Sequence, residues 1–195
     1  TFLKPYLRKA DPEKMASLQF VIAGAEKTPK RLAEEWESKF GSKYLEGYGL
    51  TETSPVSSVN LPDPPDIQNH DPHEKGARNG TAGRLLPGVT IRFVDPDTNE
   101  EKTYGESGII KLRGPNIFEG YLGQSENTDE VLKDGCFTTG DLGRLDENGF
   151  LHIEGRLSRF SKIGGEMVPH GTVEEAIVNA LAIDPGEGPV IAIAS

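Results

Sequence analysis

The sequence predicts an α/β layer, then a β subdomain, and then the start of a separate small α+β unit. An apolar strand-like run at residues 18–23 is followed by an apolar stripe with helical spacing. Short alternating segments separated by turn residues fill residues 81–154, and a second helical pattern follows residue 155. We place the three parts at residues 1–84, 85–154 and 155–195.

The α/β layer is predicted from a strand–helix–strand pattern. Residues 18–23 (LQFVIA) are almost continuously apolar, as in a buried parallel strand, and residues 44–46 return as a second strand. Glycine-containing loops follow both strands, at Gly24 and at residues 47–52. Because ligands bind outside the carboxyl ends of strands in open parallel sheets, a site is expected at these two loops.

The helix between these strands has a start signal, an apolar stripe and a stop signal. Thr28 is expected to cap it, with Pro29 at its first position. Gly41 is expected to end it. The stripe, which should face the core, consists of Leu32, Trp36 and Phe40.

The β subdomain is predicted from several short strands in succession. Residues 89–94 alternate, and residues 108–113 are also strand-like. Residues 142–145 and 150–154 flank Asp-Glu-Asn-Gly at 146–149, a hairpin signal. These strands indicate a small sheet or a barrel-like β subdomain.

The last part contains one clear helix. Thr172 and Glu175 have the spacing of a capping box. Residues 184–186 (Asp-Pro-Gly) should end this helix, and residues 190–194 resemble a further strand. The expected apolar face comprises Val173, Ala176, Ile177, Ala180 and Leu181.

Composition narrows the class of protein. The 195 residues are 35% hydrophobic and 27% charged, which is typical of a folded globular protein. A net charge of −10 argues against a nucleic-acid partner, because phosphates attract an excess of Lys and Arg. With no signal peptide or membrane-length apolar run visible and a single cysteine, Cys136, we expect a cytoplasmic protein. Membrane association through an upstream domain is left open, because we expect further N- and C-terminal parts of the same chain beyond Thr1 and Ser195.

The strongest chemical motif is Gly-Tyr-Gly-Leu-Thr-Glu at residues 47–52. Its glycines allow the backbone to approach a ligand closely. Tyr48 offers an aromatic face to a base, Thr51 a hydroxyl to a phosphate, and Glu52 an oxygen ligand to Mg²⁺. The alternative is a tight turn with a surface glutamate.

Two further motifs could complete a nucleotide site. In Thr-Thr-Gly-Asp at residues 138–141, a carboxylate held at the end of a strand by a glycine turn could accept hydrogen bonds from both ribose hydroxyls. Arg156, Arg159 and Lys162 form a cationic segment that could contact a phosphate or a ribose. The alternatives are that the first motif is an ordinary turn and that the second is a solvated linker.

Residues 61–76 are polar and proline-rich, and should be a surface excursion. A zinc site at His70 and His73 within it is not expected, because no third ligand is nearby.

Together, these motifs resemble the adenylate-forming (ANL) superfamily of acyl-CoA synthetases, luciferases and peptide-synthetase adenylation domains. The resemblance runs from about residue 18 to the end. Other segments that carry it are Gly24-Ala25, Thr81-Ala82-Gly83-Arg84, Pro87-Gly88, Gly105-Glu106, Gly114-Pro115-Asn116, Gly120-Tyr121 and Gly155-Arg156.

A narrower resemblance is to the acyl-acyl-carrier-protein synthetase branch, which includes 2-acylglycerophosphoethanolamine acyltransferases. It is carried by residues 22–27, 114–117 and 160–168.

The resemblance implies the end of the large N-terminal domain of an acyl-activating enzyme, followed by the start of its small C-terminal domain. The implied parent is an ATP-dependent ligase that converts a fatty acid to acyl-AMP and then transfers the acyl group. The acceptor is the phosphopantetheine thiol of holo-acyl carrier protein or of CoA. Because the family's phosphate loop and C-terminal lysine lie outside these residues, the 195 residues alone are hypothesised to be inactive. The alternatives are a non-catalytic AMP/ATP-binding module and a structural scaffold.

The resemblance also implies site residues. Tyr48 would stack on adenine, Thr51 would contact the α-phosphate, Glu52 would bind Mg²⁺, Asp141 would hold the ribose hydroxyls, and Arg156 would contact ribose or phosphate. The other residues bordering the adenine would be Gly24, Ala25 and Gly47.

A conformational role is implied for the segment after these motifs. Arg159 stands at the expected domain hinge, where the wider superfamily usually has Asp or Lys. Gly165 would lie on the loop that approaches the pantetheine arm.

Overall fold

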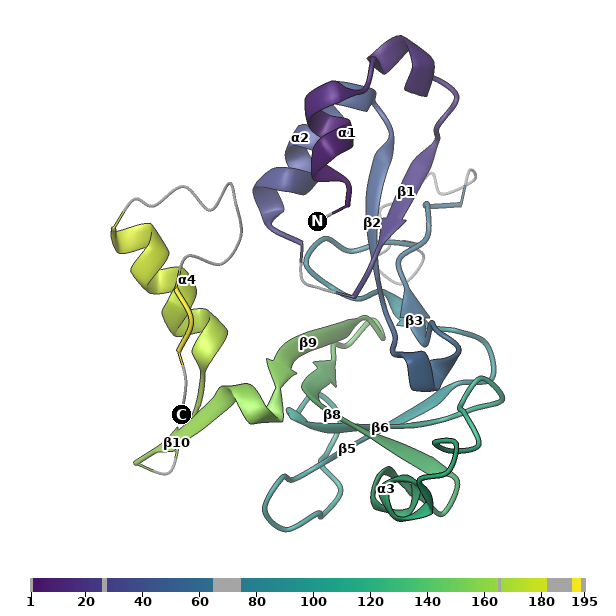
Figure 1. Cartoon of the computed structure of the whole chain (residues 1–195), viewed down its shortest axis with the longest axis vertical. Coiled ribbons are helices and arrows are strands. Elements are labelled where there is room, and N and C mark those ends of the chain that lie inside the picture. Colours follow the sequence, from purple (N-terminus) through teal and green to yellow (C-terminus); the bar gives the residue numbers. More distant parts are fainter. Residues whose placement is uncertain (1, 26–27, 65–74, 165, 182–190, 194–195) are drawn as a thin grey trace.

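Figure 1 shows the computed structural model of the chain. The structure describes residues 2–25, 28–64, 75–164, 166–181 and 191–193. Several predictions fall outside these residues, namely those on His70, His73, Gly165 and the stop at 184–186. Residues 191–193, part of the strand expected at 190–194, are not in a strand.

The N-terminal layer contains the predicted strand–helix–strand unit. Strands β1 (Phe20–Ala23) and β2 (Lys43–Tyr48) pair in parallel. Helix α2 (Lys30–Phe40) connects them, and α1 (Lys4–Lys9) packs against α2. In Figure 1 both helices lie beside the β1–β2 pair. A short 3₁₀ turn, η1 (Pro12–Met15), links α1 to β1.

Two short strands extend this sheet toward the rest of the molecule. Strands β3 (Ser58–Val59) and β4 (Arg84–Leu85) give the order β1-β2-β3-β4, with antiparallel β2–β3 and β3–β4 pairs. Neither short strand was predicted, since two residues are too few to show periodicity.

The predicted stripe of α2 forms the first core cluster. Trp36 is almost completely buried, and its indole Nε1 donates to Ser42 Oγ over 2.9 Å. A buried indole needs such an acceptor, because an unpaired N–H would cost free energy. The buried members of the cluster are Leu32, Trp36, Phe40 and Tyr44.

Two predictions about this layer are corrected. Thr28 does not cap α2: Pro29 is extended and is the N-cap, while Thr28 Oγ1 lies 3.1 Å from Tyr44 Oη. Strand β1 is not buried on both faces either, because Phe20 is 37% and Ile22 47% exposed. Gly41, in the left-handed conformation, ends α2 as predicted.

The β subdomain is a five-stranded antiparallel sheet. It contains β5 (Thr90–Val94), β6 (Gly108–Arg113), β7 (Leu132–Lys133), β8 (Cys136–Leu145) and β9 (Leu151–Arg156). Their order is β5-β6-β8-β7, and β9 pairs with β8. The predicted β8–β9 hairpin is confirmed.

A second core cluster lies between this sheet and the first. Its buried members are Ala82, Val89, Phe93, Ile110, Leu112 and Leu151. Backbone hydrogen bonds from Ala82 N to Leu151 O (2.7 Å) and from Leu151 N to Gly83 O (2.8 Å) join the segment before β4 to β9. Helix α3 (Ser125–Val131) packs against β7 and β8.

The C-terminal part continues from β9. A 3₁₀ turn, η3 (Leu157–Arg159), leads to an antiparallel hairpin of β10 (Phe160–Ile163) and β11 (Glu166–Pro169). Helix α4 (His170–Ala180) follows, and Figure 1 shows it away from the two main sheets.

The predicted capping box of α4 is wrong. The helix begins at His170 with Pro169 as an extended N-cap, so Thr172 already lies inside it. The fixed φ of proline and its missing N–H suit the residue that begins a helix, and Thr172 therefore lies three residues after the observed N-cap. Within the described residues, no helix is both long and apolar enough to cross a bilayer.

Asp146, in the β8–β9 turn, joins several segments. Its Oδ1 accepts from the amides of Asn148 (2.9 Å) and Phe150 (3.0 Å). Its Oδ2 contacts the Arg78 guanidinium (2.5 Å) and His152 Nε2 (3.0 Å). Burial raises the pKa of this carboxyl, but the hydrogen bonds outweigh it and lower the pKa to about 2.

We predict that Asp146→Asn lowers the free energy of unfolding at neutral pH by about 2 kcal/mol. Since the folded pKa lies below the ordinary value of 3.8, the ionised carboxylate stabilises the fold above that value, and this contribution is lost as the pH falls through about 2. Urea unfolding at several pH values measures the difference. Asp129→Asn, at an exposed site in α3, is the control. An equal deficit at pH 2 and pH 7 would contradict the role of the charge.

Candidate functional site

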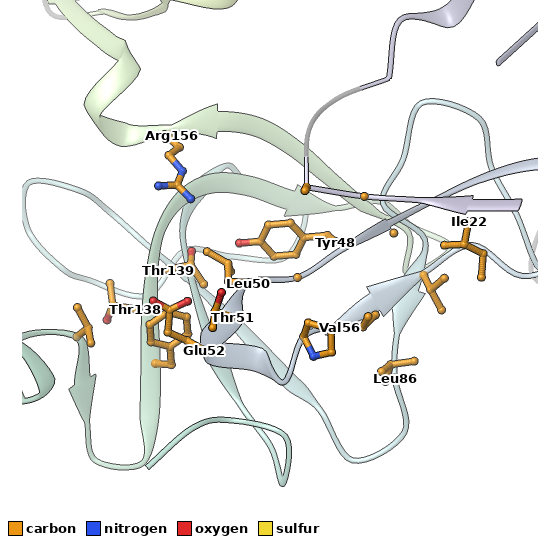
Figure 2. Close-up of a pocket in the computed structure, with 18 of the residues that line it drawn as sticks. Ile22, Tyr48, Leu50, Thr51, Glu52, Val56, Leu86, Thr138, Thr139 and Arg156 are labelled. Atoms are coloured by element: carbon orange, nitrogen blue, oxygen red, sulfur yellow. The ribbon is translucent and has the colours of Figure 1, made fainter. Parts of the chain in front are cut away.

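A large cleft opens where the carboxyl ends of β1 and β2 meet the β subdomain. Its volume is about 1080 Å³. Figure 2 shows its lining, with Ile22, Val56 and Leu86 at one end and Thr138, Thr139 and Glu52 at the other. The predicted residues that line it are Gly24, Ala25, Gly47, Tyr48, Thr51, Glu52 and Arg156.

A second pocket of about 300 Å³ adjoins the first. Tyr48 and Arg156 line both, so their side chains lie at the boundary between the two spaces. Asp141 lines this smaller pocket together with Thr28 and Glu46. The structure therefore gathers eight of the predicted residues around two adjoining cavities, namely Gly24, Ala25, Gly47, Tyr48, Thr51, Glu52, Asp141 and Arg156.

Asp141, Tyr48 and Arg156 are in direct contact. The Tyr48 hydroxyl donates to Asp141 Oδ2 over 2.6 Å, and Arg156 Nε lies 3.3 Å from Asp141 Oδ1. Asp141 is 5% exposed, whereas the Arg156 side chain is 64% exposed. Figure 2 shows Arg156, from β9, directed into the space beside the Tyr48 ring.

Burial dominates the electrostatics of this cluster. Burial, and then the negative charge of Asp141, raise the pKa of Tyr48 well above its ordinary range, so the phenol stays neutral and acts as the donor. Burial also raises the pKa of Asp141, against the hydrogen bond from Tyr48 and the charge of Arg156. These two partners therefore oppose the effect of burial and favour the ionised form of the carboxyl.

Strand register brings the second and third motifs together. Asp141 was predicted in a turn at the end of a strand, but β8 continues through it to Leu145, and Asp141 pairs directly with Arg156 of β9. The Asp141 amide donates to Thr139 Oγ1 over 3.0 Å. The register of β8 shifts between Leu142 and Gly143.

The first motif begins inside a strand rather than after it. Strand β2 includes Tyr48, which pairs with Ser58 of β3. The Tyr48 carbonyl accepts from the Ser57 amide (2.9 Å) and hydroxyl (3.1 Å). Gly49 is required next, because a Cβ there would lie 1.8 Å from the Pro55 carbonyl oxygen.

The turn after Gly49 presents Thr51 and Glu52 to the cleft. This 3₁₀ turn, η2 (Thr51–Thr53), is stabilised by the buried Thr53, whose Oγ1 accepts from the Leu50 amide over 2.9 Å. Thr51 is exposed and Glu52 is partly buried. The Tyr121 hydroxyl donates to Glu52 Oε1 over 2.7 Å, which raises the pKa of Tyr121.

The surroundings of Glu52 suit a magnesium ion that is bound to phosphates better than an ion that is held by protein side chains alone. The described residues contain no group of three or more His, Cys, Asp or Glu side chains placed to hold a metal. Mg²⁺ keeps several waters and commonly takes one or two carboxylates plus substrate phosphates. A single carboxylate beside the Thr51 hydroxyl, lining an open cleft, matches that donor set.

The other two cations of the third motif have different partners. Arg159 contacts Glu174 Oε1 over 2.5 Å, and Lys162 contacts Asp97 Oδ2 over 2.6 Å. Neither is among the residues that line the two cavities. Of this segment, the structure therefore brings only Arg156 to the candidate site.

Sequence reasoning gave no role to several residues of the site. Tyr121 was noted only as part of a Gly-Tyr motif, yet it contacts Glu52. Thr139 lines the cleft and orients the Asp141 amide. Glu46 lines the smaller pocket and accepts from the Thr28 amide over 3.2 Å. The Gly120-Tyr121 pair was the only signal in the sequence for a role of Tyr121. Its contact with Glu52 could not be predicted, because the two residues are 69 positions apart.

Comparison with known proteins decides the family. Residues 1–122 match the AMP-binding enzyme family. The chain belongs to that family. The adenylate-forming superfamily expected from the motifs is therefore confirmed.

Members with assigned activities resemble most of this chain. A long-chain-fatty-acid–CoA ligase from Yersinia pestis is 35% identical over 162 residues, which are 83% of this chain and 27% of that ligase. An indoleacetate–CoA ligase from Aromatoleum aromaticum is 32% identical over 97% of this chain and 32% of its own length. The chain thus spans less than a third of the length of either relative.

Solved structures of AMP-binding family members share the fold. Apo MatB from Rhodopseudomonas palustris matches with a TM-score of 0.72 and 33% identity, over 90% of this chain and 33% of that one. The anthranilate CoA ligase AuaEII, in complex with anthranoyl-AMP, matches with a TM-score of 0.71 and 25% identity, over 88% and 31%. The predicted fold class is confirmed. The acyl-acyl-carrier-protein synthetase branch stays a prediction.

We predict that Tyr48→Phe lowers the free energy of unfolding at pH 8 by about 1–3 kcal/mol, because the buried Asp141 carboxylate loses its phenol donor. Since the folded pKa of Asp141 is raised, the deficit should shrink at acid pH, where the carboxyl is protonated. Urea unfolding at pH 8 and pH 4 measures both values. Tyr6→Phe, at an exposed tyrosine, should change neither. An unchanged stability at pH 8 would contradict the importance of this hydrogen bond.

Proposed function

We propose that this chain is the adenylate-binding part of an ATP-dependent ligase. The parent protein would activate a fatty acid as acyl-AMP and pass the acyl group to a phosphopantetheine thiol. The observation that carries the proposal is the contact of Asp141 with Tyr48 and Arg156 beside a cleft lined by Thr51 and Glu52. The matches to CoA ligases and to a structure holding anthranoyl-AMP support the same chemistry.

Tyr48 and Asp141 would bind the nucleoside. A carboxylate accepts hydrogen bonds from both hydroxyls of a ribose, and an aromatic ring stacks on a base. Arg156, exposed beside Asp141, would contact ribose or phosphate. The adenine would lie against Gly24, Ala25 and Gly47, which line the cleft next to Tyr48.

Thr51 and Glu52 would act on the phosphates. The Thr51 hydroxyl would contact the α-phosphate, and Glu52 would hold Mg²⁺ that is also bound to the triphosphate. The metal ion neutralises charge on the phosphates when it is bound. What these two residues contribute is position, because displacement at phosphorus depends mainly on alignment and charge stabilisation.

The fatty acid would enter from the apolar end of the cleft. Ile22, Val56 and Leu86 lie there, away from Glu52, in Figure 2. In the first step a carboxylate oxygen attacks the α-phosphorus, an anhydride bond forms, and pyrophosphate leaves. In the second step a thiolate sulfur attacks the acyl carbon, a thioester forms, and AMP leaves.

The remaining assignments belong to the same proposal. Residues 1–84 and 85–154 would be two parts of a large domain. The first sheet ends one residue after this division, at Leu85 of β4, and the second begins with β5. Residues 155–195 would begin the small C-terminal domain, which turns about a hinge near Arg159. The acceptor thiol would belong to holo-acyl carrier protein or to CoA.

The test of this proposal is pyrophosphate release by the full-length parent protein. Release should depend on both a fatty acid and ATP, and comparing CoA with holo-acyl carrier protein identifies the acceptor. Nucleotide binding without release for any acyl chain would favour a non-catalytic AMP-binding module. We also propose that the 195 residues alone do not complete the reaction, since the matched ligase is far longer. Acyl-AMP formation by these residues alone would contradict that.

We predict that Asp141→Ala in the parent weakens AMP binding by about tenfold or more, because two hydrogen bonds from the ribose to a charged acceptor are lost. Isothermal titration with AMP measures the affinity. Asp129→Ala, at an exposed site in α3, is the matched control. Unchanged affinities for AMP and ATP in the Asp141 variant would remove this residue from the site.

We predict that Glu52→Ala lowers turnover by at least tenfold while changing AMP affinity less than twofold, because the metal serves the triphosphate rather than the monophosphate. Steady-state pyrophosphate release and AMP titration separate the two effects. Glu126→Ala, exposed on α3, should change neither. Equal losses of turnover and AMP affinity would count against a metal role.

A further inference from the structure

The segment between β6 and α3 folds back onto the turn that carries Glu52. The Phe118 amide donates to the Glu52 carbonyl over 2.9 Å. The Asn116 side-chain amide donates to the carbonyls of Thr53 (2.9 Å) and Val56 (2.8 Å). These contacts hold the backbone of Glu52 and of the residues that follow it, and the Glu52 side chain receives one more hydrogen bond, from Tyr121.

Tyr121 is itself held in place from several directions. Its ring packs edge-to-face on Phe118, with centroids 4.9 Å apart, and Phe118 packs in the same way on Phe137 of β8 at 5.6 Å. Its amide donates to Thr128 Oγ1 of α3 over 2.9 Å. Gly120 allows this approach: its φ is 144°, and a Cβ there would lie 2.7 Å from Thr128 Cγ2.

The hydroxyl of this fixed ring reaches one oxygen of Glu52. The distance from Tyr121 Oη to Glu52 Oε1 is 2.7 Å, and both residues line the large cleft. A carboxylate on a flexible side chain samples several rotamers, and a rigid donor on one oxygen selects among them. The other oxygen, Oε2, does not take part in this hydrogen bond.

We propose that Tyr121 is a positioning residue that holds the Glu52 carboxylate, through Oε1, in the orientation in which it would bind the magnesium ion carried by the nucleotide phosphates. This inference rests on the proposed function, because it requires Glu52 to serve the metal. Residues that hydrogen-bond to a metal ligand typically change metal affinity tenfold to a hundredfold when they are replaced. The phenol thus links the Phe118–Phe137 packing of the β subdomain to the phosphate end of the cleft.

The test uses Tyr121→Phe in the full-length protein. This variant keeps the ring against Phe118 and removes only the hydroxyl. ATP affinity is titrated calorimetrically at increasing Mg²⁺ concentrations and without Mg²⁺, and AMP affinity is measured in parallel. We expect the Mg²⁺ concentration for half-maximal enhancement of ATP binding to rise about tenfold. Metal-free ATP and AMP affinities should change less than twofold. Tyr6→Phe is the matched control and should change none of these values.

A double-variant cycle separates positioning from a structural role. Glu52→Gln alone should raise the Mg²⁺ requirement, and adding Tyr121→Phe to it should have little further effect, because the phenol acts through the carboxylate. Additive effects, or an equal loss of AMP affinity in Tyr121→Phe, would overturn the proposal. A shift in Glu52→Gln with none in Tyr121→Phe would overturn it while leaving the proposed function intact. No shift in either variant would overturn both the positioning role and the metal role of Glu52.

Discussion

The buried carboxylate of Asp141 is the constraint on which the site depends. An ionised group removed from water must find donors, and Tyr48 and Arg156 are the ones in contact with it. Tyr48 belongs to the first sheet, whereas Asp141 and Arg156 are cross-strand neighbours in the second. The contacts of this one carboxylate therefore join the two sheets, and the cleft lies beside that junction.

Crowded backbone at the junction keeps the cleft walls in place. Gly49 touches the Pro55 carbonyl so closely that no side chain fits, and the turn between them presents Thr51 and Glu52. On the opposite side, the segment that carries Tyr121 packs onto the same turn through backbone, amide and phenol contacts. The site is thus formed by short loops that are held by buried polar contacts rather than by long helices. This arrangement allows precise placement of charged groups next to open space.

The errors in the predicted elements have two causes, prolines at the helix starts and partners that are distant in the sequence. Both helix caps were assigned to threonines, yet prolines at positions 29 and 169 take the N-cap position, because each is extended and the helix starts directly after it. The Thr28 hydroxyl lies instead beside Tyr44, a partner that local sequence does not reveal. Similarly, β2 and β8 extend through motifs that were expected to be loops, since antiparallel partners pair with Tyr48 and Asp141. Tertiary hydrogen bonds thus decided the positions of Thr28, Tyr48 and Asp141 against local signals.

The sequence by itself determined the order of layers, the α2 stripe and the β8–β9 hairpin, and it singled out the motifs that contain Tyr48, Glu52 and Asp141. Those features depend on periodicity, turn residues and short motifs, all of which are local along the chain. Only the tertiary structure decided that Tyr48 meets Asp141 across 93 residues and that Tyr121 meets Glu52 across 69. The first contact depends on strand register, because a shift of one residue would turn Tyr48 or Asp141 to the other face of its sheet. The second depends on how the segment before α3 packs onto the turn that carries Glu52.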